Sequence, residues 1–341
     1  MESTESTEST ESTESTPAAQ SPVDRLKRWL RIPLGLLTLG FVVWAGRALW
    51  QQWDSSASVS ISWGLAAAAI VPTVGICLFQ AWGWVLLIRR MSGVRVPWGS
   101  GTELYLASSL GRYLPAKVGM PVILMAGGAR YGIRPILMVS SMLLIVGTYT
   151  VAGGVVAFTV FALTGGALAG ELAPVMNQSA PPLLIASILG TLALMVLDRR
   201  RYPAVFLRLL KIDGGRGPLL SPAVVACYVI VWLFWLVHGA LLTMAVGATP
   251  GQALAAAPYF VLAPIIGFLA LIAPGGVGVR EAVISAGLLA SVGPAAALVA
   301  ALLSRMISLG VDALTWVCAR PLRGAGSDAT LPESGPAREA R

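Results

Sequence analysis

Long apolar runs, separated by short polar or Gly/Pro-rich stretches, occupy most of the chain from residue 32 to residue 318. A helix needs about 20 apolar residues to cross roughly 30 Å of hydrocarbon, whereas strands of a membrane barrel alternate apolar and polar positions over about 10 residues. The runs are continuous rather than alternating, so they predict membrane-spanning helices. Six full spans are expected, at residues 32–50, 62–88, 135–163, 182–197, 222–246 and 295–318.

Two further apolar regions, 97–129 and 253–292, are broken near their middles. The first contains RYLPAKVGMP at 112–121, and the second contains APGGVGVRE at 273–281. Each region is therefore either a re-entrant pair of half-helices or two complete crossings. The arms of the first region, about 15 and 12 residues long, are short for a full crossing, so a re-entrant pair is favoured there. The second region is expected to have the same form, with two full crossings as the open alternative.

Basic residues are unevenly distributed among the connections between these segments. The connections 51–60, 164–181, 247–252 and 292–295 contain no Lys or Arg. Cytoplasmic loops carry an excess of these residues, so both termini are predicted to be cytoplasmic, provided that each interrupted region starts and ends on one side. The basic residues of the other connections are Arg25, Lys27, Arg28, Arg31, Arg89, Arg90, Arg95, Arg130, Arg134, Arg199, Arg200, Arg201, Arg208, Lys211, Arg216, Arg320 and Arg323.

The composition agrees with a membrane protein. Of the 341 residues 56% are hydrophobic and 12% are charged, far from the balance of a soluble domain. The net charge of +8 lies at the ends of apolar runs, which indicates membrane topology and no nucleic-acid partner. The cysteines Cys77, Cys227 and Cys318 lack metal-type spacing and are interpreted as small buried hydrophobes, so neither a metal nor a cofactor is expected.

The order of segments repeats along the chain. Residues 32–163 contain two spans, then a broken region, then a third span, and residues 182–318 contain the same segments in the same order. Three net crossings per half is an odd number, so the second half is expected to be inverted relative to the first, as in many transporters whose site lies where interrupted helices meet. The predicted fold is an all-α polytopic membrane protein with a transport domain at 25–323. Polar tails at 1–24, which holds five Glu-Ser-Thr repeats, and 324–341 are expected to be disordered.

The backbone at the two breaks is suited to an anion. Irregular backbone at membrane depth must be covered by protein or line a watery cavity. Proline is tolerated in the first turn of a helix, so Pro115 and Pro274 are expected to open the second arm of each region. The resulting helix N-termini would favour an anion, and Gly275, Gly276 and Gly278 would let a ligand approach bare backbone.

Cationic side chains accompany both breaks. Arg112 and Lys117 flank the first and Arg280 follows the second, which predicts a phosphate-binding site. The alternative is that Arg112 and Lys117 extend to lipid headgroups at the surface. Glu281 is expected either to balance Arg280 as a buried ion pair, which could be purely structural, or to take up a proton during transport.

Three other polar residues lie within predicted spans. Arg305 and Asp312 are seven positions apart, hence on one helical face, and are assigned to the pocket or to its scaffold without a choice between the two. The single histidine, His238, is interpreted as a helix-contact residue rather than a ligand.

The segments LGRYLPAKVG (110–119) and PGGVGVRE (274–281) resemble the paired motifs of the lysylphosphatidylglycerol synthase transmembrane-region family, also called flippase-like. That family includes the membrane half of the multiple peptide resistance factor, which resembles a lipid flippase joined to an aminoacyl-lipid synthase. The tail after residue 323 is not expected to be a synthase domain, so the resemblance is expected to be that of a stand-alone relative without lipid-modifying activity. The residues at family motif positions are Arg112, Tyr113, Pro115, Lys117, Pro274, Gly276, Gly278, Arg280 and Glu281.

Three functions compete at this point. The leading hypothesis is a flippase or transporter that moves an anionic membrane lipid, a phospholipid or a polyprenyl-phosphate-linked sugar, across a bacterial or archaeal cytoplasmic membrane. No GxxxxGK[ST] loop is present, so movement is expected to be downhill or ion-coupled. The alternatives are a membrane glycosyltransferase or lipid-modifying enzyme, with Glu103, Glu281 and Asp312 as the carboxylates, and a transporter of small anions. The lipid, the direction of movement and a homo-oligomeric state stay open.

Overall fold

The computed structural model describes residues 59–113, 119–164, 219–269 and 276–323. All regular secondary structure in these ranges is helical. Several sequence predictions lie outside the described residues: the spans 32–50 and 182–197, both tails, and the site residues Pro115, Lys117, Pro274 and Gly275.

Within the described ranges, five helical stretches are long and apolar enough to cross a membrane, which makes the chain a multi-pass membrane protein. Helices occur where the sequence predicts spans at 62–88, 135–163 and 222–246. The stretches are α2 (Trp63–Ala68) with α3 (Ile70–Ser92), α6 (Pro135–Leu163), α9 (Pro222–Ala245), α10 (Pro250–Leu269) and α11 (Val279–Ala319).

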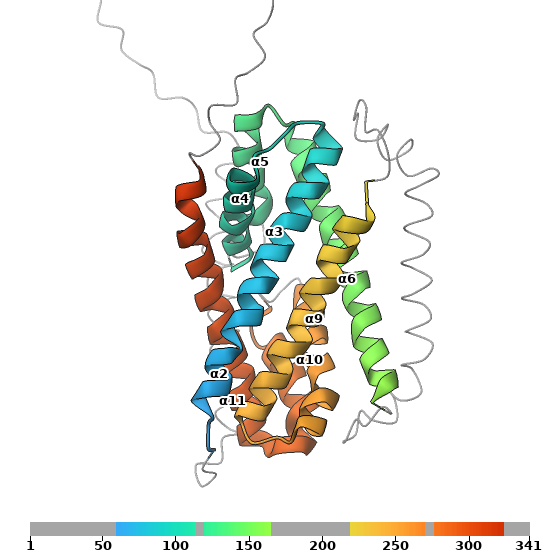
Figure 1. Cartoon of the computed structure of the whole chain (residues 1–341), viewed down its shortest axis with the longest axis vertical. Coiled ribbons are helices and arrows are strands. Elements are labelled where there is room, and N and C mark those ends of the chain that lie inside the picture. Colours follow the sequence, from blue (N-terminus) through green and yellow to red (C-terminus); the bar gives the residue numbers. More distant parts are fainter. Residues whose placement is uncertain (1–58, 114–118, 165–218, 270–275, 324–341) are drawn as a thin grey trace, which may run out of the picture.

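The first interrupted region forms a pair of short helices. α4 (Trp98–Leu110) has 13 residues and α5 (Gly119–Gly128) has 10. At about 1.5 Å per residue, each helix is shorter than the roughly 30 Å that a full crossing requires. A 3₁₀ turn, η1 (Gly111–Tyr113), follows α4 and carries Arg112. The two helices pack together in the upper half of the molecule, and the C-terminal end of α4 points toward the middle of the molecule (Figure 1).

The second interrupted region comprises α10 and the first part of α11. α11 bends at Gly293, whose φ of 78° is rarely adopted by other residues, next to Pro294. The part after this bend matches the predicted span at 295–318. The prediction that the second arm opens at Pro274 is wrong, because the helix begins at Val279 with Gly278 as its N-cap residue.

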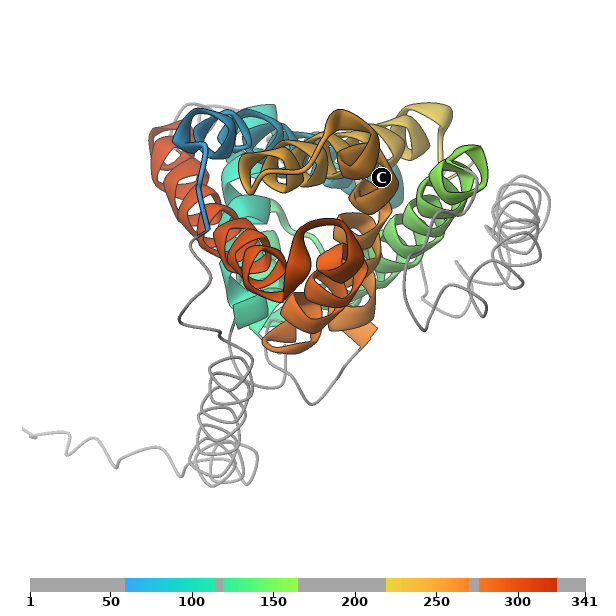
Figure 2. The ribbon, with the colours of Figure 1, turned by 90° about the horizontal axis from the view of Figure 1, so that it is seen from below.

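The described elements follow one another along the chain in a fixed order, while the first predicted span of each half lies outside the described residues. α3, the α4–α5 pair and α6 are followed by α9, the pair made by α10 with the start of α11, and the rest of α11. In Figure 1, α4 and α5 lie in the upper half and α10 in the lower half. Seen end-on in Figure 2, α6 lies at one edge, and α2 lies with part of α11 at the opposite edge. The two interrupted pairs are thus at opposite ends of the helix bundle.

Large aromatic rings pack directly on glycines of neighbouring helices. A Cβ atom on Gly153 of α6 would lie 2.5 Å from the Trp232 ring of α9, and one on Gly239 of α9 would lie 2.5 Å from the Phe260 ring of α10. The Trp232 indole N–H also donates a hydrogen bond of 2.7 Å to the Tyr149 carbonyl. Helices in membranes associate through such close packing of small residues, because lipid provides little hydrophobic drive between them. α9 is therefore held tightly between α6 and α10.

We expect Gly239→Ala to lower the free energy of unfolding by about 1–3 kcal/mol, because the added methyl group overpacks the contact with Phe260. Thermal unfolding of the detergent-solubilised protein would measure this effect. Gly310→Ala is the matched control: its Cβ would meet nothing within 4 Å, so the change should be neutral or slightly stabilising. Equal melting temperatures for the two variants would contradict the packing argument.

Candidate functional site

A cavity of about 110 Å³ lies where the two interrupted regions approach each other. Its wall includes Arg112 of η1 and Arg280 of α11, so each break contributes one cation. The remaining wall is largely apolar, with polar groups from Gln80, Tyr105 and Tyr149. A concave, mostly apolar space with a few convergent polar groups is the usual form of a ligand site.

Arg280 is buried, with 9% of its surface exposed, and its guanidinium carbon lies 5.3 Å from the centre of the Trp235 ring. No carboxylate among the described residues forms an ion pair with it. A buried cation is costly unless it is paired or hydrogen-bonded. The position on the cavity wall therefore leaves Arg280 able to bind an anion.

The backbone of the second break is pressed against α10. Gly276 has a φ of 70°, and a Cβ atom there would lie 2.9 Å from the Cα of Gly267. A Cβ on Gly267 would in turn lie 2.5 Å from Cγ of Arg280. Both positions thus require glycine, and their close approach sets the Arg280 side chain along α10 and into the cavity wall.

Glu281 stabilises the start of α11. Its Oε2 accepts a 2.6 Å hydrogen bond from the Gly278 N–H, and its Oε1 lies 3.7 Å from Nε of Arg305. The predicted pairing of Glu281 with Arg280 is wrong. Adjacent residues on a helix do not face each other, so the two side chains diverge and Glu281 reaches Arg305, 24 positions later.

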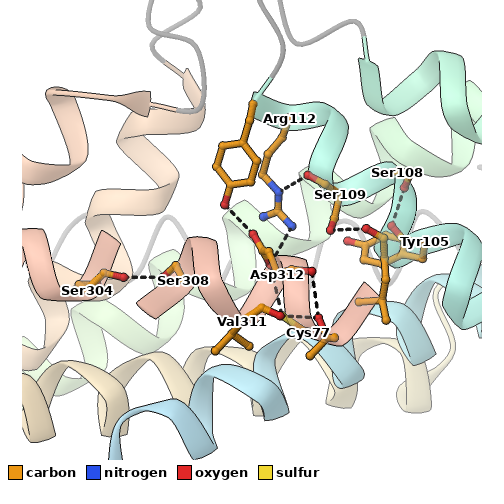
Figure 3. Close-up of polar contacts among 12 residues, drawn as sticks. Cys77, Tyr105, Ser108, Ser109, Arg112, Ser304, Ser308, Val311 and Asp312 are labelled. Carbon is orange, nitrogen blue, oxygen red and sulfur yellow. Dashed lines mark hydrogen bonds and ion pairs between the residues drawn. The ribbon is translucent and has the colours of Figure 1, made fainter. Parts of the chain in front are cut away.

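Asp312 is the centre of a second polar cluster, which ties α11 to the first break (Figure 3). The Tyr113 hydroxyl donates a 2.5 Å hydrogen bond to Oδ2, and the Cys77 thiol donates one of 3.3 Å to Oδ1. An Arg112 terminal nitrogen lies 3.7 Å from Oδ1, while Nε of Arg112 donates a 2.7 Å bond to the Ser109 carbonyl. Cys77 and Cys227 are buried as predicted, and Cys77 in addition donates to a carboxylate, whereas the predicted burial of Cys318 is wrong because its side chain is exposed.

Tyr113 also connects the two clusters. The guanidinium carbon of Arg305 lies 5.5 Å from the centre of the Tyr113 ring, whose hydroxyl contacts Asp312. Arg305 and Asp312 share one face of α11, as predicted; Asp312 contacts the first break, and Arg305 contacts both breaks. Neither belongs to the cavity wall. Their position agrees with the scaffold alternative.

His238 is fully buried and joins three helices. Its Nδ1 lies 2.9 Å from the Thr73 hydroxyl of α3, and its Nε2 lies 2.9 Å from the Ser304 hydroxyl of α11. The interpretation of His238 as a helix-contact residue is confirmed. The sequence interpretation missed Gln80, Tyr105 and Tyr149 on the cavity wall. Gln80 carried a usable signal, since an amide in the middle of an apolar span is costly unless it serves a site or a helix contact.

A comparison with known families finds a match that covers most of the chain. The sequence model of the family described as "Lysylphosphatidylglycerol synthase TM region" matches residues 30–314. The matched range includes both breaks, the cavity wall and Asp312. No curated protein is similar enough to the chain to count as a match.

We expect Glu281→Ala to destabilise the protein by about 3–5 kcal/mol, because it removes the partner of a buried cation as well as the cap of α11. Adding Arg305→Met should recover part of that loss, since the double variant no longer buries a cation that has lost one of its partners. Denaturant titration of the single and double variants would measure both effects. Strictly additive losses would show that Glu281 and Arg305 do not interact.

Proposed function

The chain belongs to the lysylphosphatidylglycerol synthase TM-region family, and from that premise we propose that it is a flippase or transporter that moves a lipid with an anionic headgroup between membrane leaflets. Family membership indicates a function related to membrane lipids. The observation that carries the finer proposal is the presence of Arg112 and Arg280, one from each break, on the wall of one cavity.

The cavity suits a phosphate better than a whole lipid. Sites for drug-sized molecules measure roughly 300–1,000 Å³, and this cavity is about 110 Å³. A headgroup phosphate would lie between the two guanidinium groups, whose planar donors match phosphate oxygens, while the acyl or prenyl tails stay in the bilayer. Lys117, Pro115, Pro274 and Gly275, outside the described residues, complete the proposed site on grounds of sequence.

The arrangement of the two breaks supports alternating access. The α4–α5 pair and the α10–α11 pair lie at opposite ends of the bundle and meet at the cavity. In our proposal both pairs are re-entrant, the two halves are inverted repeats, and both termini face the cytoplasm, as the basic connections predict. Rocking of one half against the other would then expose the phosphate site to each leaflet in turn.

The contacts that the carboxylates make argue against the alternative of a lipid-modifying enzyme. A glycosyltransferase needs carboxylates to hold a metal or accept a proton. Glu281 is engaged by Gly278 and Arg305, and Asp312 is engaged by Tyr113, Cys77 and Arg112. Glu103 is buried within α4 and also has a partner. We therefore place transport ahead of catalysis.

The test is lipid movement in liposomes that contain the purified protein and a fluorescent phosphatidylglycerol, measured as loss of protection from dithionite. Arg280→Ala and Arg112→Ala are each expected to slow movement by about tenfold or more, because each removes a charge-assisted contact to phosphate. Arg320→Ala is the matched control, since Arg320 is exposed and stacks on Trp316 away from the cavity. Unchanged rates in both cavity variants would overturn the site.

The same liposomes separate the competing functions. Inhibition by excess glycerol phosphate, together with uptake of that compound, would support a small-anion transporter. Mass spectrometry that finds altered lipid after incubation with sugar nucleotides would support an enzyme. Lipid movement without either result supports the flippase.

A further inference from the structure

Asp312 is a buried carboxylate on which proton donors from two other elements converge. Only 6% of its surface is exposed. The Tyr113 hydroxyl of η1 donates to its Oδ2, the Cys77 thiol of α3 donates to its Oδ1, and a terminal nitrogen of Arg112 lies 3.7 Å from the same Oδ1 (Figure 3). An ionised carboxylate only accepts hydrogen bonds, whereas a protonated one must also place its own O–H on an acceptor. The arrangement therefore fits an ionised Asp312.

Two of these three donors belong to η1, at the first break. A group that binds the ionised form of a carboxylate more tightly than the neutral form is bound less tightly once the carboxylate takes up a proton, because the two equilibria are linked. Protonation of Asp312 would remove its charge attraction to Arg112, and the new O–H would compete with the donors already present. A proton on Asp312 thus weakens the contact between η1 and α11.

We propose that Asp312 is a proton-binding site whose protonation releases η1 from α11. One proton passes from solvent to the carboxylate, which becomes a neutral acid, and no other bond changes. In the reverse direction, separation of η1 leaves Cys77 as the last of the three donors, and a buried carboxylate with so few partners takes up a proton rather than stay charged. The coupling of this switch to lipid movement rests on the proposed function, with the proton as the coupling ion, whereas the switch itself does not.

The charged and titratable groups near Asp312 come from the elements packed around it. They are Cys77 of α3, Tyr105 of α4, Arg112 and Tyr113 of η1, Tyr149 of α6 and Arg305 of α11. Arg305 forms an ion pair with Glu281. His238 of α9 contacts α11 at Ser304, eight positions before Asp312. The cation that forms an ion pair with the Asp312 carboxylate is thus Arg112 among the described residues.

The sign of the coupling is the same for any further cation at the first break. Lys117 lies four positions after Tyr113 and outside the described residues. A lysine that reached Asp312 would favour the ionised carboxylate, as Arg112 does. Such a contact would strengthen the coupling rather than reverse it.

The Cys77 thiol can report on the switch, because it is only 3% exposed and lies against the same carboxylate as η1. Release of η1 should uncover it, so that a maleimide reacts faster. Cys227→Ala with Cys318→Ala leaves Cys77 as the single cysteine, and Cys77→Ser with Cys227→Ala leaves the exposed Cys318 as the reference. Both proteins would be labelled in detergent at pH 8 and pH 5. The reference corrects for the fraction of reactive thiolate, which falls as the pH falls.

We expect the ratio of the Cys77 rate to the Cys318 rate to rise about tenfold from pH 8 to pH 5, a common size for coupling between two sites. Asp312→Asn resembles the neutral acid and should give a high ratio at both pH values. Glu281→Gln is the matched control: it removes the other buried carboxylate of α11 and should keep the rise. Size-exclusion profiles would verify that each variant folds.

A ratio that stays constant or falls from pH 8 to pH 5 would overturn the switch, and this comparison needs neither carboxylate variant. A rise that persists in a folded Asp312→Asn protein, or that disappears in a folded Glu281→Gln protein, would overturn the assignment to Asp312.

Lipid movement is measured separately, with fluorescent phosphatidylglycerol in liposomes at the same two pH values. If the switch is observed and no lipid moves, the proposed function is wrong and the switch stands. If lipid moves at the same rate at both pH values while the switch is observed, the proton is not the coupling ion. A rate that depends on pH in the unaltered protein but not in Asp312→Asn supports both.

Discussion

A charge inside a membrane protein must be paired or lie against a polar cavity, and in this protein α11 is where that requirement is met. Glu281, Arg305 and Asp312 all belong to α11, and their contacts reach both breaks. The Glu281–Arg305 pair also spans the bend at Gly293, so it connects the two parts of the helix. The geometry of the cavity depends on these contacts, because they fix η1 and the start of α11 relative to each other.

Close packing of neighbouring helices on glycine also determines how the cavity is formed. Contacts at Gly153 and Gly239 draw α6, α9 and α10 together, and the contact between Gly267 and Gly276 brings the second break onto α10. Arg280 then lies between α10 and the Trp235 ring, with its charge at the cavity. A polar site is thus built from apolar helices chiefly by placing small residues where the backbones must approach.

The sequence was sufficient to predict helices at 62–88, 135–163 and 222–246, because a continuous apolar run of this length has few structural alternatives to a membrane helix. It also predicted that Arg112 and Arg280 lie near each other, and both belong to the wall of one cavity. It did not predict which acid pairs with which base: spacing along α11 assigns a helical face, but the contact of Asp312 with Cys77 joins residues 235 positions apart and depends on tertiary packing. The start of α11 at Val279 was missed for a related reason, since Pro274 was a plausible first-turn residue and the actual cap uses the Glu281 side chain.

The two breaks differ in how they are attached to α11. Arg280 and Glu281 are part of α11, so the second break moves with the first part of that helix. Among the described residues, the side chains of Arg112 and Tyr113 contact α11 through a 3.7 Å ion pair, one hydroxyl hydrogen bond and a ring contact with Arg305, and α4 also packs on α11. Non-covalent contacts of this kind can exchange partners at far lower cost than unwinding a helix. Displacement of η1 from α11 would therefore have to break the Tyr113–Asp312 hydrogen bond.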